Sequence, residues 1–405
     1  MPEQVETVII GGGQAGLAMS YHLGQLGRQH IVLERGRIAE RWRSERWESL
    51  VFQFPNSMIR LPGYAYEGDE PERFMARDGV VRFIDEYAKR IVAPVRGGVN
   101  VTRLRPVTGS ARFAVETEGG IIEASNVVVA TGPYQEPSLP LFSDGLSQDL
   151  YQTTANRYSN PDRLPDGAVL VVGSGASGYQ IAADLLKSGR QVHLSVGRHR
   201  RVPRRYRGKD YGYWQEATGA LDQTADTLPP NFVPPLLTGV DGGRDADLRI
   251  LEGEGTTLLG SLRGIHGNRL HFKPDLEENI AEGDKGVALF KRMVDAFVTD
   301  QDIGAPVDQQ IPTATQPVAM SALELDVRAV GIGTIIWATG YCYDFRWIDF
   351  PVLDNSGKPR HRRGVTEIPG IYFLGLARLH KLKSAFLWGS GEDASYIAEH
   401  IAARK

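Results

Sequence analysis

An arginine-rich stretch follows a glycine motif in the middle of the chain. Six arginines fall between Arg198 and Arg207, although the formal net charge of the protein is −3. Just before them, Gly173, Gly175 and Gly178 have the spacing GxGxxG. Guanidinium groups form strong hydrogen bonds with phosphate oxygens, and a glycine turn lets phosphate approach backbone N–H groups. Together these residue types predict a site for a phosphate-bearing ligand.

The same glycine spacing occurs near the N-terminus, at Gly11, Gly13 and Gly16. Residues 7–35 and 168–198 align without gaps. Each contains a short β-branched strand, the glycine turn, a helix with apolar residues at helical spacing and a second strand. This pattern predicts a βαβ unit that binds a dinucleotide. The first glycine makes the tight turn, the second lets pyrophosphate approach the backbone, and the third lets the helix pack on the strand.

The two units differ where their second strands end. Glu34 ends that strand in the first unit. A carboxylate there accepts hydrogen bonds from an adenosine ribose and repels a 2′-phosphate. The matching position in the second unit is Val196, and Arg198 follows two residues later. We therefore predict that the first unit binds FAD and the second binds NADPH.

The arginine run is predicted to bind the 2′-phosphate of NADPH. Arg198 is the principal candidate, with Arg204 or Arg205 beside it and His199 nearby. Most of the other arginines are expected to be solvated. A nucleic-acid-binding or targeting patch is the alternative interpretation of such a run, and the acidic total charge counts against it.

The composition is that of a globular enzyme with two domains, with 41% hydrophobic and 23% charged residues in 405. No apolar run approaches the length that crosses a bilayer, and the first residues do not resemble a signal peptide, so we expect a cytoplasmic protein. The single cysteine, Cys342, makes no disulfide framework or redox pair, and the nine histidines lack metal-ligand spacing. We expect no bound metal.

Further segments follow one another in an order that resembles the bacterial branch of the flavin-containing monooxygenase family, over nearly the whole chain. They read ERWRSERWESL, VVVATGPY, TIIWATGY, IPGIYFLGL and GSGEDASYI. The resemblance implies an α/β protein with two Rossmann-like dinucleotide-binding domains, the NADPH domain being inserted into a split FAD domain. The expected boundaries are 1–160 for the first part of the FAD domain, 161–334 for the NADPH domain and 335–405 for the C-terminal part of the FAD domain.

The resemblance also implies an activity. Such an enzyme consumes NADPH and O₂ and transfers one oxygen atom, by way of a flavin C4a-hydroperoxide, to a small soft nucleophile such as an amine or a sulfide. Its expected partners are that substrate and O₂, with no nucleic acid and no membrane, and a homodimer stays open. The family pattern FxGxxxHxxxY is altered, because Thr154 stands at the histidine position and Tyr158 at the aromatic one.

Two alternatives therefore stay open. The first is a flavoprotein reductase or oxidase, which passes electrons from NAD(P)H to a quinone, a protein or O₂ without oxygenating a substrate. The second is a dinucleotide sensor without catalytic activity. The altered position at Thr154 favours keeping the reductase in view.

The candidate catalytic residues are Asn56, Tyr158 and His380. Asn56 lies where the family has an asparagine beside the flavin, and its amide is able to donate a hydrogen bond there; a turn residue after a proline is the alternative. The other predicted cofactor-binding residues, beyond the two glycine triplets, Glu34, Arg198, His199 and Arg204, are Gln14, Ala15, Arg35, Arg41, Trp42, Trp47, Val101, Ala130, Thr131, Gly132, Ser174, Ser177, Thr339, Gly340, Gly375, Leu387 and Gly389.

Overall fold

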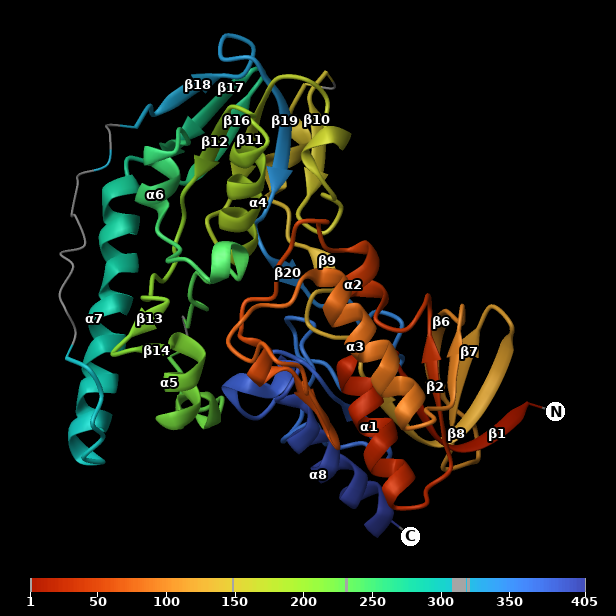
Figure 1. Cartoon of the computed structure of the whole chain (residues 1–405). Helices are drawn as coiled ribbons and strands as arrows, with labels where there is room; N and C mark the ends of the chain where they lie inside the picture. The colour runs from red at the N-terminus through yellow and green to blue at the C-terminus, as the bar shows by residue number, and fades with distance from the viewer. Residues whose placement is uncertain (1, 148, 230–231, 308–317, 319–320, 405) are drawn as a thin grey trace.

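The protein has two lobes, each built on its own sheet (Figure 1). The computed structural model describes residues 2–147, 149–229, 232–307, 318 and 321–404. The first lobe contains the N-terminal βαβ unit and the C-terminal helix, and the second lobe comes from the middle of the chain. Within the described residues, no helix is both long and apolar enough to cross a membrane, and no cluster of His, Cys, Asp or Glu side chains is arranged to hold a metal ion.

The first sheet has the strand order β5-β2-β1-β8-β7-β6, with β21 paired to β8. Strands β1, β2, β5, β8 and β21 run parallel, whereas β6 and β7 are antiparallel to their neighbours. The C-terminal parts of β1 and β8, with the sequences TVII and VVV, are β-branched because they are buried on both faces of the sheet. The strands are β1 (Glu3–Ile10), β2 (His30–Glu34), β5 (Val95–Gly97), β6 (Val101–Pro106), β7 (Phe113–Thr117), β8 (Gly120–Val129) and β21 (Ile371–Phe373).

Helices α1 and α8 pack against each other in the first lobe, and α3 lies beside α1 and α2. The segment between α2 and α3 carries a short 3₁₀ turn, η1, and the hairpin β3–β4. The elements are α1 (Gln14–Gln25), α2 (Glu40–Ser44), η1 (Asn56–Met58), β3 (Arg60–Leu61), β4 (Tyr64–Ala65), α3 (Arg77–Arg90), η6 (Leu382–Ala385) and α8 (Ser390–Ala403).

The second sheet is parallel throughout, with the order β10-β19-β11-β12-β15. The helix of the second βαβ unit is α4, and the long helix α7 lies on the outer side of this lobe (Figure 1). Its elements are β10 (Tyr151–Thr154), β11 (Ala168–Val172), α4 (Ala176–Lys187), β12 (Val192–Ser195), α6 (Leu248–Gly253), β15 (Thr257–Leu259), α7 (Leu276–Asp300) and β19 (Ile332–Trp337).

Smaller elements complete the second lobe. Strands β16, β17 and β18 form an antiparallel sheet, and β13 and β14 form a hairpin that leads into α5. Their bounds, with the remaining 3₁₀ turns, are η2 (Leu141–Gly145), η3 (Pro161–Arg163), β13 (Arg205–Tyr206), β14 (Lys209–Asp210), α5 (Tyr211–Ala217), η4 (Ala220–Asp222), η5 (Val240–Gly242), β16 (Leu262–His266), β17 (Arg269–Phe272) and β18 (Glu324–Asp326).

Strand pairing moves the expected domain boundaries. Strand β10 lies inside the segment 1–160, yet it pairs with β19 in the second sheet. Strand β19 crosses the expected boundary at 334 and pairs on its other side with β11. The chain passes between the lobes where β9 (Glu136–Pro137) pairs with β20 (Tyr341–Cys342), and Figure 1 shows both strands between the lobes. The two segments that connect the lobes therefore lie side by side.

Candidate dinucleotide sites

The two glycine turns have the same backbone geometry. Gly11 has a φ of +117° and Gly173 a φ of +107°, in the left-handed region that favours glycine. A Cβ on either residue would lie 2.5 Å from a carbonyl oxygen, that of Ala130 in the first lobe and that of Ala338 in the second. Each turn therefore needs glycine for two reasons: the positive φ, and the close approach to the residue that follows the neighbouring strand, β8 in the first sheet and β19 in the second.

The third glycine of each triplet is required for packing. A Cβ on Gly16 would lie 1.9 Å from the carbonyl oxygen of Gly11, and one on Gly178 would lie 1.8 Å from that of Gly173. No side chain fits at these distances. These two glycines hold α1 and α4 tightly against the turns that precede them.

The second glycine of each triplet faces open space. A Cβ on Gly13 or Gly175 would meet no protein atom within 4 Å. Both residues are helix N-caps, of α1 and α4, and no side chain caps either helix. Uncapped N–H groups at the positive end of a helix dipole bind phosphate. The two turns thus fit the pyrophosphate groups of two dinucleotides.

A cavity of about 320 Å³ covers the first glycine turn. Its size is in the range of cofactor sites. It is lined by many of the residues that the sequence predicts for FAD, namely Gly11, Gly13, Gln14, Ala15, Glu34, Arg35, Arg41, Trp42, Val101, Ala130, Thr131, Gly132 and Gly375. The lining also includes residues that sequence reasoning missed, among them Arg46, Asn100, Tyr134, Gln135, Trp347 and Ala385.

The carboxylate of Glu34 is held in one orientation. Its Oε2 accepts a hydrogen bond of 2.7 Å from the N–H of Gly12, and its Oε1 accepts one of 2.9 Å from the N–H of Gly36. Each carboxylate oxygen has a second lone pair, which is able to accept a ribose hydroxyl. The position of Glu34 in the cavity wall suits that role.

Arg35, Arg41 and Arg46 all line this cavity. Glu45 accepts hydrogen bonds from Arg35 at 2.8 Å and from Arg41 at 2.5 Å. Burial lowers the pKa of Arg41, and the like charges of Arg35 and Arg46 act in the same direction. An anionic ligand in the cavity would relieve this repulsion, as pyrophosphate would.

The guanidinium of Arg46 lies between two aromatic rings. Its carbon is 5.9 Å from the ring centroid of Trp42 and 5.1 Å from that of Tyr134. Tyr134 belongs to the loop after β8, far away in sequence. No sequence pattern therefore identifies Arg46 as a site residue, because the contact exists only in the folded chain.

The glutamine that begins α1 connects two walls of the cavity. The Nε2 of Gln14 donates to the carbonyl of Ala385 at 3.1 Å, and its Oε1 accepts from the indole Nε1 of Trp42 at 3.3 Å. The sequence predicts that Trp47 contacts the cofactor, with a place in the core as the alternative, and the structure agrees with the alternative because Trp47 does not line the cavity. Trp47 is 4% exposed and packs in the hydrophobic core of the second lobe with Leu50.

An exposed arginine, Arg198, follows the second strand of the second βαβ unit. Val196 is buried at the position that matches Glu34, and the hydroxyl of Ser174 is hydrogen-bonded to the backbone of Gly197 at 3.1 Å. The next residue, Arg198, is exposed and makes no hydrogen bond or ion pair with any residue that the structure describes. Its guanidinium is therefore available to a ligand at the strand end.

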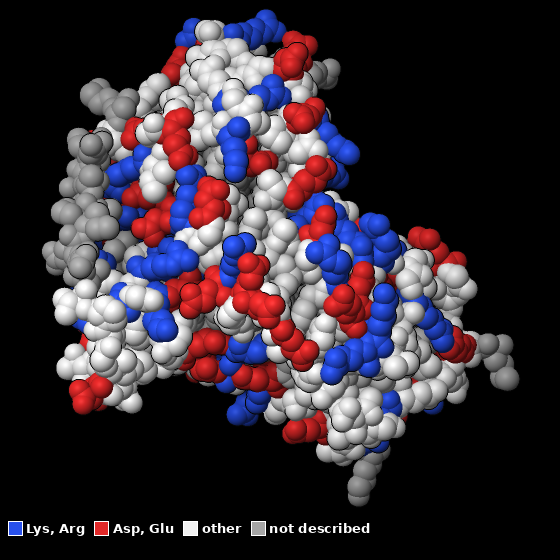
Figure 2. Space-filling model, viewed as in Figure 1, with Lys and Arg blue, Asp and Glu red and all other residues white. Residues whose placement is uncertain are grey.

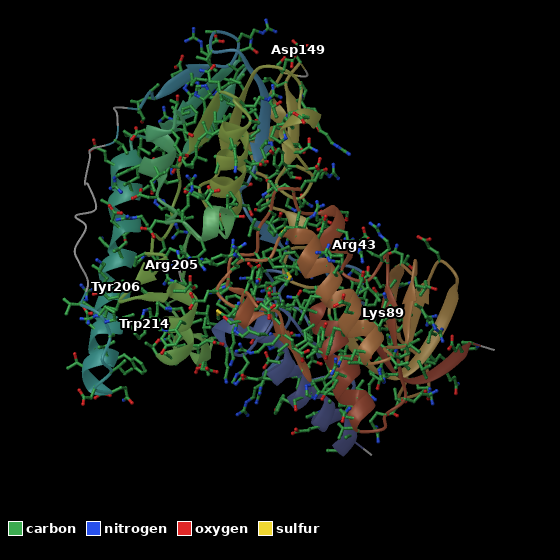
Figure 3. The ribbon with its side chains drawn as sticks, in the orientation of Figure 1. Arg43, Lys89, Asp149, Arg205, Tyr206 and Trp214 are labelled. Atoms are coloured by element: carbon green, nitrogen blue, oxygen red, sulfur yellow. The ribbon has the colours of Figure 1, made fainter. Side chains whose placement is uncertain are left out.

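The other arginines of the run form hydrogen bonds with the protein, although Arg205 is also exposed to solvent. Arg201 pairs with Asp247 and Asp284, and Arg207 pairs with Asp295 of α7. The guanidinium of Arg205 donates to the carbonyls of Gly242 and Gly243, whereas the hydroxyl of the next residue, Tyr206, donates to Asp295 of α7 (Figure 3). On the face in Figure 2, acidic and basic side chains are interspersed. Arg201 and Arg207 thus attach the segment after β12 to α7.

Two predicted ligands of the 2′-phosphate have other roles. Arg204 is 2% exposed, and its guanidinium pairs with Asp210 at 2.7 Å and donates to the carbonyl of Gln53 at 2.7 Å. His199 is 7% exposed, has its Nδ1 within 3.1 Å of the carbonyl of Gly197 and packs against α7; burial lowers its pKa. Neither side chain is free to reach a phosphate, so both predictions are corrected.

We expect the variant Arg198→Ala to raise the KM for NADPH about ten- to a hundredfold and to leave the KM for NADH nearly unchanged. Each hydrogen bond to a charged group contributes about 1.5–3 kcal/mol, and only NADPH carries the 2′-phosphate. Steady-state kinetics with both donors measures the effect. Equal losses with both donors would contradict the assignment.

Tyr158 is part of the second lobe's core and not of an active site. It is 2% exposed, and its hydroxyl donates to Asp184 at 2.5 Å. Burial raises the pKa of Tyr158, and Asp184 raises it further. A phenol held in this way has no access to a substrate, so the catalytic role predicted for Tyr158 is corrected.

The variant Tyr158→Phe is expected to lower the free energy of unfolding by about 1–2 kcal/mol, because Asp184 loses a donor. Turnover with NADPH should stay within about twofold of the parent protein. Urea denaturation and NADPH oxidation measure the two quantities. A large loss of turnover at unchanged stability would restore a catalytic role.

Asn56 is buried, at 5% exposure, with its amide already in use. Its Nδ2 donates to the carbonyl of Glu70 at 2.9 Å, while its Oδ1 has no partner among the described residues. The sequence suggested a donor, but the atom left wholly unpaired is an acceptor. His380 is half-buried, and its backbone carbonyl accepts a hydrogen bond from the N–H of Ala225. The catalytic role of its side chain stays a prediction.

Some of the remaining predicted residues have structural roles, and for the others no contact with a ligand is tested. Leu387 is 2% exposed in a hydrophobic cluster, and a Cβ on Gly389 would lie 1.8 Å from the carbonyl of Lys383, so both positions are explained by packing. Thr339 donates its hydroxyl to the carbonyl of Ser138. Residues predicted at the second turn whose ligand contacts stay predictions are Gly173, Gly175, Gly178, Ser174, Ser177, Thr339 and Gly340.

Comparison with known proteins agrees with this geometry. Residues 8–216 match the family model described as pyridine nucleotide-disulphide oxidoreductase. An "Uncharacterized oxidoreductase CzcO-like" of Geobacillus kaustophilus is 33% identical over 99% of both chains. The indole-3-pyruvate monooxygenase YUCCA1 of Oryza sativa is 28% identical over 47% of this chain and 47% of its own.

Solved structures share the fold. A flavin-containing monooxygenase from Stenotrophomonas maltophilia matches with a TM-score of 0.68, at 18% identity and over 99% of both chains. A bacillithiol disulfide reductase from Bacillus cereus matches with a TM-score of 0.63, at 18% identity and over the whole of both chains. The two glycine turns, the family match and the full-length relative agree: the chain belongs to the pyridine nucleotide-disulphide oxidoreductase family and is an oxidoreductase related to flavin monooxygenases.

Proposed function

We propose that this protein is an FAD-dependent monooxygenase that takes electrons from NADPH and transfers one oxygen atom of O₂ to a small soft nucleophile, an amine or a sulfide. One observation carries the proposal. The two βαβ units have glycine turns of the same geometry, but different charges follow their second strands: Glu34 ends β2, and Arg198, which has no partner among the described residues, follows β12. An acidic end suits a free ribose and a basic end suits a 2′-phosphate, so one chain would hold FAD and NADPH.

The residues of the first lobe fit FAD. The uncapped N-terminus of α1 would hold the pyrophosphate, Glu34 the ribose, and Arg41 the phosphate charge. Bound FAD would supply the electron transfer and the activation of O₂, which the protein's own side chains do not provide. Gln14 and Trp42 both line the cavity and are joined by a hydrogen bond, so they would shield bound FAD from water on that side.

Oxygen transfer is tested by product analysis with isotopically labelled O₂. The FAD-loaded protein is given NADPH and a panel of amines, sulfides and ketones, while NADPH consumption and H₂O₂ release are recorded. We expect labelled product from an amine or a sulfide and less H₂O₂ than NADPH consumed. H₂O₂ equal to the NADPH consumed, with no labelled product from any member of the panel, would contradict the proposal.

A reductase that passes electrons to another acceptor is the second candidate. Thr154 stands where the monooxygenase resemblance has a histidine, and its hydroxyl donates at 2.6 Å to Asn156. The fold is also that of a bacillithiol disulfide reductase. Rapid NADPH-dependent reduction of a quinone, without labelled product, would favour this candidate. The lone Cys342 is exposed and offers no pair of thiols for disulfide chemistry.

A further inference from the structure

A group of aromatic rings lies beside the cavity of the first lobe. We call Phe52, Phe54, Phe386 and Trp388 the aromatic cluster. The ring of Trp388 is 4.8 Å from that of Phe54 and 5.2 Å from that of Phe386, and Phe54 is 5.7 Å from Phe386. The ring of Phe52 is 5.9 Å from Trp42, which lines the cavity. Two segments far apart in sequence therefore build one apolar wall.

The cluster contains a buried donor that lacks an acceptor. Trp388 is 8% exposed, and its indole Nε1 is buried without a partner among the described residues. Other indoles are satisfied: Trp214 donates to the carbonyl of Tyr206 at 2.7 Å, and Trp337 to Gln152 at 2.9 Å. A buried N–H without an acceptor costs free energy, which a hydrogen bond to a ligand or to an ordered water would recover.

The unpaired donor lies three residues after Ala385, which lines the cavity. Ala385 lines the cavity and directly precedes Phe386, and Gln14 joins Ala385 to Trp42 by hydrogen bonds of 3.1 and 3.3 Å. The aromatic cluster itself does not line the cavity, but it borders two residues that do, Trp42 through the ring of Phe52 and Ala385 through the adjacent Phe386. The unpaired Oδ1 of Asn56 lies on the same segment, two residues after Phe54.

The charges near the cluster favour an uncharged acceptor. Lys381 and Lys383 lie on the same loop as Trp388, but both are paired with Asp222 and Glu392. These two lysines leave no free cation for a carboxylate. An aromatic wall with one neutral N–H donor suits a flat ring that carries a carbonyl or a similar neutral acceptor.

We propose that the aromatic cluster is the subsite for the substrate's ring and that the indole N–H of Trp388 selects an aromatic substrate with a neutral hydrogen-bond acceptor. This inference rests on the proposed monooxygenase function and names its substrate class. The isoalloxazine ring offers the same acceptor chemistry through its carbonyls, and the experiment below separates the two sources.

The test measures binding of two probes of equal shape to the oxidised, FAD-loaded protein by equilibrium dialysis. The probes are 4′-(methylthio)acetophenone, which has a carbonyl acceptor, and 1-isopropenyl-4-(methylthio)benzene, which has none. The parent protein should bind the ketone about tenfold more tightly. The variant Trp388→Phe should lose this preference, because it should bind the ketone more weakly and the alkene with unchanged affinity. Trp337→Phe removes an indole N–H that is already paired with Gln152, and it should leave the preference unchanged.

Two results would overturn the inference. One is equal affinity of the parent protein for both probes, a result that does not depend on the folding of any variant. The other is a Trp388→Phe protein with lowered FAD content and an intact probe preference, which would assign the N–H to the flavin. Because binding is measured without turnover, failure of the proposed function would appear only in the labelled-oxygen experiment.

Discussion

Replacing Gly13 by valine is expected to give a folded protein that contains no FAD. The backbone of Gly13 has φ −90° and ψ −174°, which valine adopts without strain, and its Cβ would meet no protein atom. The valine methyl groups would instead occupy the space in front of the α1 N-terminus, where pyrophosphate must approach. The ratio of flavin absorbance to protein absorbance should fall at least about tenfold.

Matched glycine variants separate binding from folding. Gly16→Ala should fail to fold, because its Cβ would lie 1.9 Å from a carbonyl oxygen. Gly175→Val should keep FAD and lose NADPH binding, since Gly175 is the open position of the second turn. Thermal stability of Gly13→Val is to be compared with FAD-stripped parent protein, because loss of a ligand itself lowers the melting temperature. A yellow, fully loaded Gly13→Val protein would refute the FAD assignment.

The variant Arg204→Met is expected to lower the free energy of unfolding by about 3 kcal/mol or more, the usual cost of breaking a buried ion pair. It would leave Asp210 without its cation and the carbonyl of Gln53 without its donor. The guanidinium also lies 4.3 Å from the ring centroid of Phe74, so a cation–π contact is lost. The midpoint of urea denaturation, followed by tryptophan fluorescence, measures the effect.

Arg205 provides the control for this prediction, because it is the neighbouring arginine and is exposed. Arg205→Met removes only hydrogen bonds to the carbonyls of Gly242 and Gly243 and should change stability by less than about 0.5 kcal/mol. Adding Asp210→Asn to Arg204→Met should recover part of the loss, because the uncompensated charge is removed while an amide oxygen remains able to cap α5. Equal effects of Arg204→Met and Arg205→Met would show that the buried pair is unimportant.

Features that lie within one βαβ unit were readable from the amino-acid sequence. The glycine triplets, the strands around them and the acidic residue Glu34 all lie within about thirty residues, where steric rules for glycine and strand burial act locally. The duplicated pattern therefore predicted the parallel strands of each βαβ unit and the turns at Gly11 and Gly173, which the structure contains.

Features that depend on distant partners were decided by the tertiary structure. The sequence shows Arg198 and Arg204 as members of one run, yet only folding pairs Arg204 with Asp210 and with the carbonyl of Gln53, whereas Arg198 has no partner in the part of the chain that the structure describes. Similarly, Trp42 and Trp47 both contact one hydrophobic cluster, but only Trp42 also lines the cavity, whereas Trp47 is buried. Burial and charge pairing depend on the elements that meet in space, and no local pattern encodes those meetings.

The same reason applies to the lobe boundaries and to the aromatic cluster. Strands β10 and β19 belong to one sheet because they pair with each other, not because of their own composition. Phe54 and Trp388 come into contact although more than three hundred residues separate them. The sequence by itself determined the two glycine turns and the difference in charge near the ends of the second strands, where one unit has Glu34 and the other has Arg198. The tertiary structure alone decided which arginine is free, which tyrosine is buried and which indole lacks an acceptor, because each depends on contacts between distant segments.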